Sequence, residues 1–398
     1  MNSPWVVLGV TLAIQAITAA AALTGPVLAP DIAGSIGMRA ALVGVQVGII
    51  YGAAAISSLL SGGLVRRFGA VRLSQIALIL VAAGLGVSLA GTAPAIAAGA
   101  GLIGFGYGVV TPASSHLLAQ STPRHRMGLV FSLKQTGVPI GGVLAGLALP
   151  PLALVFGWRS AVGLTIAACI GMALLAQIVR NGLDGDRNPG KGMRMLQALK
   201  DIFADPALRR LAFVSFVFAA MQLILTGYLV TFLTEARGLS LAVAGTIMAI
   251  SQAAGVGGRL GWGWCADRFL GTRPLLAIIA ALSAICSALF AIEAGNGAVF
   301  LIVITAAVFG AAAIGWNGVF LAEVARIAPK ESVGAATGAA LFMTYAGVVA
   351  GPPAFAVIVS HAGFAVAFTA AAVIMAAMSL FLFFGGTGRE RQISETPS

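Results

Sequence analysis

Two basic side chains, Lys134 and Arg259, stand inside long apolar stretches of this sequence. Each lies eight residues from a charged residue at the edge of its stretch, Lys134 from Arg126 and Arg259 from Asp267, which is about 12 Å along a helix. At that depth in a membrane an ionisable group costs roughly 2.5–3.5 kcal/mol. Arg can bind a carboxylate through two hydrogen bonds, and Lys acts as a compact point charge. The two cations predict a small-anion site. Alternatively, each pairs with a backbone carbonyl or with Glu323, or extends to the membrane surface.

Other polar and aromatic residues in the apolar stretches are candidates to line the same site. Gln15 and Gln222 share helix faces with threonines, and Gln252 falls on the helix face of Arg259. Interhelical hydrogen bonding and aromatic packing are the alternative roles. Besides the two cations, the candidate substrate-binding residues are Gln15, Gln222, Gln252, Trp316, Asn317, Tyr107 and Tyr345.

A second set of residues is predicted to act in gating or coupling. Glu323 is predicted to be the only clear buried acid, and Arg326 follows it by three residues. We expect these two to pair near a cytoplasmic gate, with proton transfer by Glu323 as the alternative. His116 is a candidate because histidine is the side chain type that can change charge near neutral pH, although a packing histidine is the more common case. Asp267 and Arg268 complete this set.

Composition places these residues in a membrane protein. Of 398 residues, 59% are hydrophobic and 9% are charged, against roughly 25% charged in soluble domains. A soluble fold could not cover that much apolar surface with polar residues. The net charge of +11 comes from basic residues in short breaks between apolar runs, so we expect no nucleic-acid partner.

Twelve segments reach the roughly 20 apolar residues that a membrane-spanning helix needs. They are 5–29, 41–64, 73–91, 95–119, 127–150, 158–180, 211–233, 241–264, 274–294, 298–322, 333–357 and 363–384. We expect a six-helix bundle over 1–180 and a second over 211–385. A cytoplasmic linker over 181–210 would carry an amphipathic piece at 193–203, and 386–398 would form a disordered cytoplasmic tail.

The basic residues also predict the orientation of the chain. With the N-terminus in the cytoplasm, eighteen Lys and Arg residues fall in inside loops or the tail and three fall in outside loops. Cytoplasmic loops carry such an excess of basic residues. We therefore expect a multi-pass protein of the cell inner membrane with both termini cytoplasmic and an uncleaved first helix.

The two halves of the sequence resemble each other at an offset of 206 residues. The matching pairs are Pro123 with Pro329, Gly128 with Gly334, Gly141 with Gly347, and Gly157 with Gly363. Gln15 and Gln222 match near the middle of the first helix of each half, at an offset one residue larger. Parallel repeats of this kind are typical of carriers that bind substrate between the halves, near the membrane midplane.

A short loop motif links the chain to a known family. The stretch Gly263-Trp264-Cys265-Ala266-Asp267-Arg268-Phe269, with Gly271 one place late, resembles the loop that the major facilitator superfamily carries between helices eight and nine. The copy between helices two and three, 62–69, has Arg66 where the family prefers Asp. The chain resembles this family over essentially its whole length. Segments 132–139 and 315–323 are similar to the bacterial cyanate/nitrate-like group, and 258–260 to monocarboxylate and oxalate–formate carriers.

The resemblance implies an all-α membrane protein with two six-helix bundles, in which helices five and eight face each other. Lys134 and Arg259 would then face one cavity. It implies a secondary active transporter that moves a small organic or inorganic anion by alternating access, driven by a proton or by exchange. A drug or metabolite efflux antiporter and a non-transporting sensor are the alternatives. The sequence shows no phosphate-binding loop, catalytic triad or metal-ligand spacing. We therefore expect a monomer in lipid without enzymatic activity, cofactor or metal.

Overall fold

A computed structural model describes residues 4–36, 43–185, 200, 203–293 and 298–384. Regular secondary structure in these ranges is helical throughout. The predicted tail at 386–398 and nearly all of the amphipathic piece at 193–203 lie outside the described residues.

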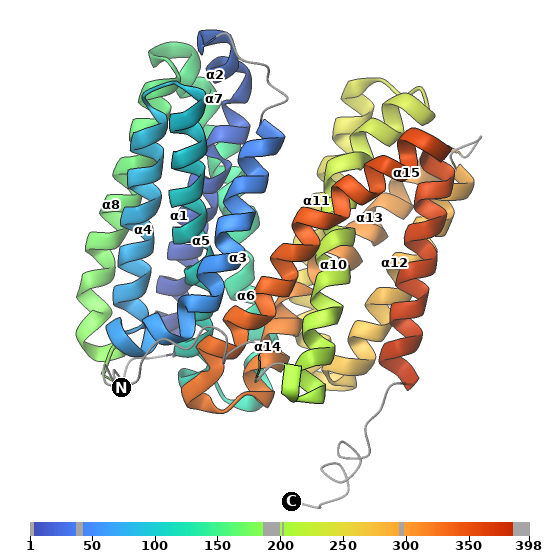
Figure 1. The fold of residues 1–398 in the computed structure, drawn as a ribbon. Coiled ribbons are helices and arrows are strands. Elements are labelled where there is room, and N and C mark those ends of the chain that lie inside the picture. Colours follow the sequence, from blue (N-terminus) through green and yellow to red (C-terminus); the bar gives the residue numbers. More distant parts are fainter. Residues whose placement is uncertain (1–3, 37–42, 186–199, 201–202, 294–297, 385–398) are drawn as a thin grey trace, which may run out of the picture. The chain divides into compact units, whose positions relative to one another are not determined.

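The first half of the chain forms helices that follow each other with short connections (Figure 1). They are α1 (Pro4–Val27), α2 (Ala29–Ile36), α3 (Val43–Phe68), α4 (Ala70–Ser88), α5 (Ala93–Ser121), the 3₁₀ turn η2 (Arg124–Arg126), α6 (Met127–Gln135), α7 (Gly137–Phe156) and α8 (Trp158–Leu183).

The second half contains α10 (Pro206–Thr231), the π-helical η3 (Phe232–Ala236), α11 (Leu241–Cys265), the π-helical η4 (Ala266–Leu270), α12 (Thr272–Glu293), α13 (Val299–Gly315), α14 (Asn317–Ile327), the 3₁₀ turn η5 (Lys330–Ser332) and α15 (Val333–Phe384).

The described helices account for the twelve expected membrane spans. Ten helical stretches are long and apolar enough to cross a membrane. One of them contains α15, which Gly363, with φ 79° and ψ 173°, divides into two helices. Helix α11, with 25 residues, is not one of these ten stretches. With α11 included and α15 counted as two, the described residues provide the twelve predicted spans.

The fifth and tenth spans are each interrupted near their middle. Helix α6 ends at Gln135 and α7 begins at Gly137, because Pro139 has no amide hydrogen to donate to the carbonyl of Gln135. Helix α13 likewise ends before Trp316, and α14 begins at Asn317. Both interruptions fall beside predicted site residues.

The repeat seen in the sequence is confirmed in the local backbone. Gly157 and Gly363 both adopt a positive φ, 83° and 79°, which glycine tolerates without strain. Pro123 and Pro329 have nearly equal dihedral angles, and each precedes a three-residue 3₁₀ turn. Corresponding positions in the two halves therefore make the same turns between helices.

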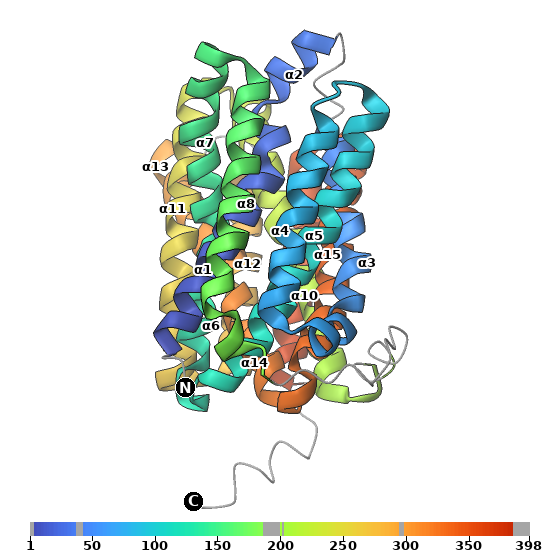
Figure 2. The same cartoon turned by 90° about the vertical axis from the view of Figure 1, so that its left-hand side faces the viewer.

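The chain divides into two compact units that do not coincide with the sequence halves. Unit 1 comprises 1–216 and 321–349, and unit 2 comprises 217–320 and 350–398. The predicted boundary within 181–210 therefore stays a prediction. In unit 1, α3 packs on α5, α4 on α5 and α8, and α1 on α7 (Figures 1 and 2).

Small residues let the helices of unit 1 approach closely. A Cβ at Gly108 would overlap the Ala54 carbonyl oxygen of α3, and one at Gly141 would overlap the Ala16 carbonyl oxygen of α1. Small residues at helix contacts are typical of membrane proteins. Large apolar side chains such as Leu154 of α7 are exposed instead, as expected of a surface that faces lipid.

Candidate functional site

Lys134 lies in the core of unit 1, with 1% of its surface exposed. Its Nζ donates hydrogen bonds to Gln15 Oε1 at 2.8 Å, Thr111 Oγ1 at 3.2 Å and Gln135 Oε1 at 3.1 Å. The Thr111 hydroxyl also donates to Gln15 Oε1, at 3.0 Å. We call these four residues the Gln15 cluster. The Lys134 side chain therefore ends inside the unit and does not extend to the surface.

Three helices position the Gln15 cluster. Helix α1 supplies Gln15, α5 supplies Thr111, and the end of α6 supplies the two remaining members. Gly137, the first residue of α7, sits against the Leu12 carbonyl oxygen and the Gln15 side chain. A larger residue at position 137 would displace Gln15, so the helix break and its glycine fix the place of the amide.

A second polar group, which we call the Gln222 cluster, forms in unit 2. Gln222 Oε1 accepts hydrogen bonds from Trp316 Nε1 at 3.1 Å and from Asn317 Nδ2 at 2.9 Å. Trp316 is fully buried, and its ring lies 5.4 Å from the rings of Phe218 and Phe320. The structure thus brings together three residues that the sequence predicted for one site.

Arg259 is the second buried cation, with 3% of its surface exposed, and belongs to α11 in unit 2. Helix α11 packs tightly on α13, where a Cβ at Gly258 would overlap the Ala311 carbonyl oxygen. Trp262 Nε1 also donates to that oxygen, at 2.7 Å. Gln252, predicted beside Arg259, has an exposed side chain.

Three of the four tyrosines in the chain meet in unit 1. Tyr107 and Tyr345 were predicted site residues, and Tyr51 joins them. The ring centroids lie 6.0 Å apart for Tyr51 and Tyr107, 5.9 Å for Tyr51 and Tyr345, and 6.4 Å for Tyr107 and Tyr345. We call this group the tyrosine cluster.

The predicted pairing of Glu323 with Arg326 is confirmed. The carboxylate and guanidinium lie 3.4 Å apart, with the two side chains 26% and 20% exposed. Arg326 also donates to the backbone carbonyl of Arg124, at 3.3 Å. The interpretation of Glu323 as the only clear buried acid is wrong, because its side chain keeps contact with solvent and Asp184 is more deeply buried.

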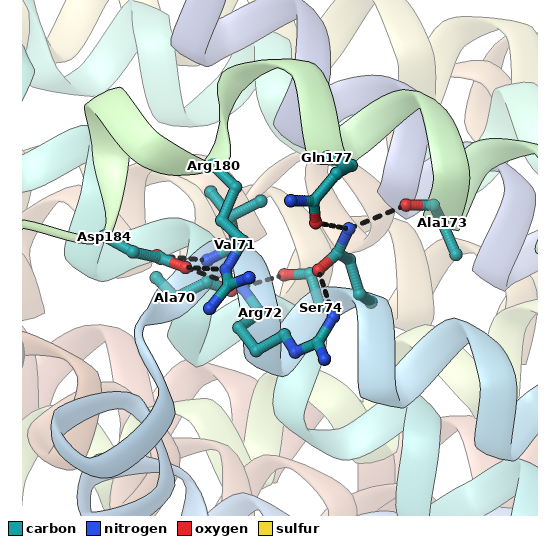
Figure 3. Close-up of polar contacts among 9 residues, drawn as sticks. Ala70, Val71, Arg72, Ser74, Ala173, Gln177, Arg180 and Asp184 are labelled. Atoms are coloured by element: carbon teal, nitrogen blue, oxygen red, sulfur yellow. Dashed lines mark hydrogen bonds and ion pairs between the residues drawn. The ribbon is translucent and has the colours of Figure 1, made fainter. Parts of the chain in front are cut away.

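Asp184 is 3% exposed and stands at the end of α8, against the first turn of α4 (Figure 3). Its carboxylate accepts hydrogen bonds from the backbone amides of Val71 and Arg72, at 2.8 and 3.0 Å, and lies 3.7 Å from Arg180 Nε. The start of a helix favours a negative charge. Gly69, with φ 89°, leaves room for this carboxylate. Asp184 therefore ties the end of α8 to α4.

The remaining predicted coupling residues lie near helix ends. His116 is buried in α5, and its Nε2 lies 3.0 Å from Gln120 Nε2. Asp267 is half-buried and Arg268 exposed, where α11 continues into η4. Gly271 ends this loop with φ 70°, which explains a glycine at that position. Their roles in gating stay predictions.

Sequence reasoning did not single out Thr111, Gln135 or Asp184. Thr111 lies one helical turn after Tyr107, a spacing that could have placed it on the same face. Gln135 adjoins Lys134 in the sequence. Asp184 follows a predicted span, and although Arg180 lies four residues before it, the backbone amides that it binds are 112 and 113 residues away.

Comparisons with known proteins agree with this arrangement. The sequence matches the family model described as the Major Facilitator Superfamily over residues 10–352 and again over 262–397. The fold is similar to the E. coli fucose:proton symporter FucP, with 16% identity and a TM-score of 0.77 over 97% of this chain and 100% of that chain. It is also similar to the human organic anion transporter MFSD10 (16% identity, TM-score 0.76, 95% and 97% of the two chains).

A third similar structure is a bacterial homologue of the iron transporter ferroportin in an outward-facing state. It shares 13% identity and has a TM-score of 0.74, over 95% of this chain and 99% of that chain. At such identities the structural likeness concerns the fold alone.

Proposed function

The chain belongs to the major facilitator superfamily, and we propose on this basis that it is a secondary active transporter for a small organic or inorganic anion. Proteins of this family are membrane transporters. The main observation in favour of an anionic substrate is the position of Lys134, a basic residue with 1% exposure in the core of an apolar helical unit. A charge at such a position is a functional-site candidate by default.

The surroundings of Lys134 support an anion site. Its Nζ donates hydrogen bonds to neutral oxygens of Gln15, Thr111 and Gln135. Arg259 is a second buried cation, in unit 2. Among the described residues that are fully buried, the only acid is Asp184, at the end of α8. The core thus carries a positive charge that suits an anionic substrate and disfavours a cationic one.

The packing of α15 supports alternating access. The first turns of α15 belong to the second half of the sequence repeat yet pack within unit 1. Ser61 of α3 donates to the Gly334 carbonyl oxygen at 3.2 Å, and a Cβ at Gly338 would overlap the Ser58 carbonyl oxygen. Such close contacts between segments from the two halves would have to part when one side of the carrier opens.

The proposal of an anionic substrate is tested first by ligand binding and then by transport measurements. Purified protein would be screened by thermal shift against monocarboxylates, dicarboxylates, nitrate and cyanate, and positive ligands would be followed into proteoliposomes. We expect Lys134→Gln and Arg259→Gln to lose ligand stabilisation. Lys330→Gln, which removes an exposed cation of η5, is the matched control and should retain it. Full stabilisation of both core variants would contradict the proposal.

Measurements of transport into proteoliposomes also distinguish a carrier from a non-transporting sensor. They further distinguish proton coupling from exchange. Uptake driven by an inward pH gradient would indicate proton coupling, and uptake that needs anion inside the vesicle would indicate exchange. Binding without flux under either condition would favour a non-transporting sensor.

We also propose the inner membrane as the location, with both termini cytoplasmic. The support is the excess of Lys and Arg in one set of loops. A reporter that is active only in the cytoplasm, fused after Ser398, should be active, and the same reporter inserted after Gly157 should not.

A further inference from the structure

The tyrosine cluster lies beside the cation of unit 1. Tyr107 belongs to α5, as does Thr111 of the Gln15 cluster. Residues four apart lie on the same helix face, with about 6 Å of rise between them. Thr111 Oγ1 in turn accepts a hydrogen bond from Lys134 Nζ. The tyrosine cluster and the hydrogen-bond partner of Lys134 therefore lie on the same face of α5, about one helical turn apart.

The cluster offers both aromatic surface and hydroxyl groups. Tyr107 and Tyr345 are 9% and 6% exposed, whereas Tyr51 is half-buried and gives the cluster an accessible edge. A hydrogen bond joins the side chains of Tyr51 and Tyr107. The ring planes of Tyr51 and Tyr107 meet at 85°, an edge-to-face arrangement that aromatic rings prefer. A further flat ring could contact these rings in the same way.

We propose that the anion bound in unit 1 is an aromatic carboxylate, an inference that rests on the proposed function and names its substrate class. The carboxylate would take the place of one of the amide oxygens that now accept from Lys134 Nζ, and the aromatic ring would pack against Tyr107 and its two neighbours. The rise of about 6 Å between positions 107 and 111 suits a ring attached to the carboxyl group directly or through a short linker.

The first experiment compares ligands on the unaltered protein. Benzoate and cyclohexanecarboxylate have the same charge and similar size, and only benzoate has a π system. Isothermal titration of the full chain in detergent should show benzoate binding roughly 2- to 10-fold more tightly, the range expected for one favourable aromatic contact. Acetate and nitrate should bind more weakly than either.

The second experiment tests whether the preference for benzoate over cyclohexanecarboxylate depends on the tyrosine cluster. Tyr107→Leu should remove the advantage of benzoate over cyclohexanecarboxylate, whereas Tyr107→Phe, which keeps the ring, should retain it. Tyr228→Leu is the matched control, because Tyr228 is the remaining tyrosine and lies in unit 2, where its hydroxyl donates to the Pro352 carbonyl oxygen. If Tyr107→Leu does not fold, Tyr51→Leu supplies the same test at the half-buried edge.

The outcomes separate this inference from the proposed function. Equal affinity for the two ring acids, or tighter binding of acetate or nitrate, would overturn the aromatic substrate and leave the anion carrier standing. Absence of binding by these four anions and by the dicarboxylates and cyanate of the wider screen would overturn both. A benzoate preference that survives Tyr107→Leu and Tyr51→Leu would place the aromatic contact elsewhere and overturn the assignment to this cluster.

Discussion

The Gln15 cluster and the Gln222 cluster are built on corresponding residues, yet they carry different charges. Both glutamines lie near the middle of the first helix of their half, and both use a side-chain oxygen as a shared acceptor. Gln15 Oε1 accepts from the ammonium of Lys134 and from Thr111. Gln222 Oε1 accepts from a neutral indole and a neutral amide. The two halves have therefore kept the same acceptor and diverged in the donors that surround it.

Because of this difference, we expect the two clusters to have different roles in substrate binding. A charge-assisted hydrogen bond is roughly twice as strong as a neutral one, so the Gln15 cluster should contribute most of the affinity for an anion. Once Gln222 has accepted two hydrogen bonds, the Trp316 ring and the Asn317 amide are held in fixed positions. The Gln222 cluster should therefore shape the site more than it holds charge.

The largest predicted effect comes from removing the cation. Lys134→Gln should lower anion uptake into proteoliposomes roughly 10- to 100-fold, because hydrogen bonds to charged groups contribute about 1.5–3 kcal/mol. Asn317→Ala, which removes a neutral donor from the other cluster, should lower uptake by less than about 10-fold. Equal losses in the two variants would remove the distinction between the clusters.

Removing each glutamine tests the same contrast through stability. Gln15→Leu should destabilise the protein by about 1–3 kcal/mol, because it takes an acceptor from a buried ammonium. Gln222→Leu should cost less, because Gln222 is half-buried and water can replace part of its hydrogen bonding. Thermal melting of both variants in the same detergent is the measurement. A larger loss for Gln222→Leu would reverse the order.

The helix contacts behind the two clusters should also differ. A Cβ at Gly141 would overlap backbone atoms of Ala16 and Ala20, whereas one at Gly255 would chiefly meet the side chain of Ile314. The overlap at Gly141 is the closer of the two and falls first on backbone atoms, whereas a Cβ at Gly255 meets the Gly310 carbonyl oxygen only at 3.1 Å. Gly141→Ala should therefore lower the melting temperature by an amount that reflects about 1–3 kcal/mol of overpacking, and Gly255→Ala should lower it less. Similar shifts for the two variants would contradict this reading.

The smallest predicted effect lies outside both clusters. Glu323→Gln should change stability by no more than about 1 kcal/mol, because exposed ion pairs contribute little. Uptake driven by a pH gradient should stay within about fivefold of the unaltered protein, as expected from a change of that size. Loss of proton-driven uptake with exchange retained would instead identify Glu323 as the coupling acid.

Much of the fold was determined by sequence periodicity and composition. Twelve apolar segments of the right length, glycine and proline matches at an offset of 206 residues, and a paired Glu323 and Arg326 were all predictable. Each of these features depends on residues that are close together in the sequence, and the repeat consists of such local patterns that occur twice. A span, a helix end and a three-residue pairing each depend on neighbours in the chain, so the order of residues is enough to indicate them.

Which residues meet in the site was decided by the tertiary structure. Lys134 was recognisable as a buried cation, but Thr111 and Gln15 lie 23 and 119 residues from it. The contact of Asp184 with α4 could not be predicted from the sequence, since the backbone amides that it binds are 112 and 113 residues away. The sequence by itself determined that a charge would lie inside an apolar bundle. Only the packing of α1, α5 and α6 determined which neutral oxygens would hold it, because hydrogen bonds between helices depend on distances that local sequence does not encode.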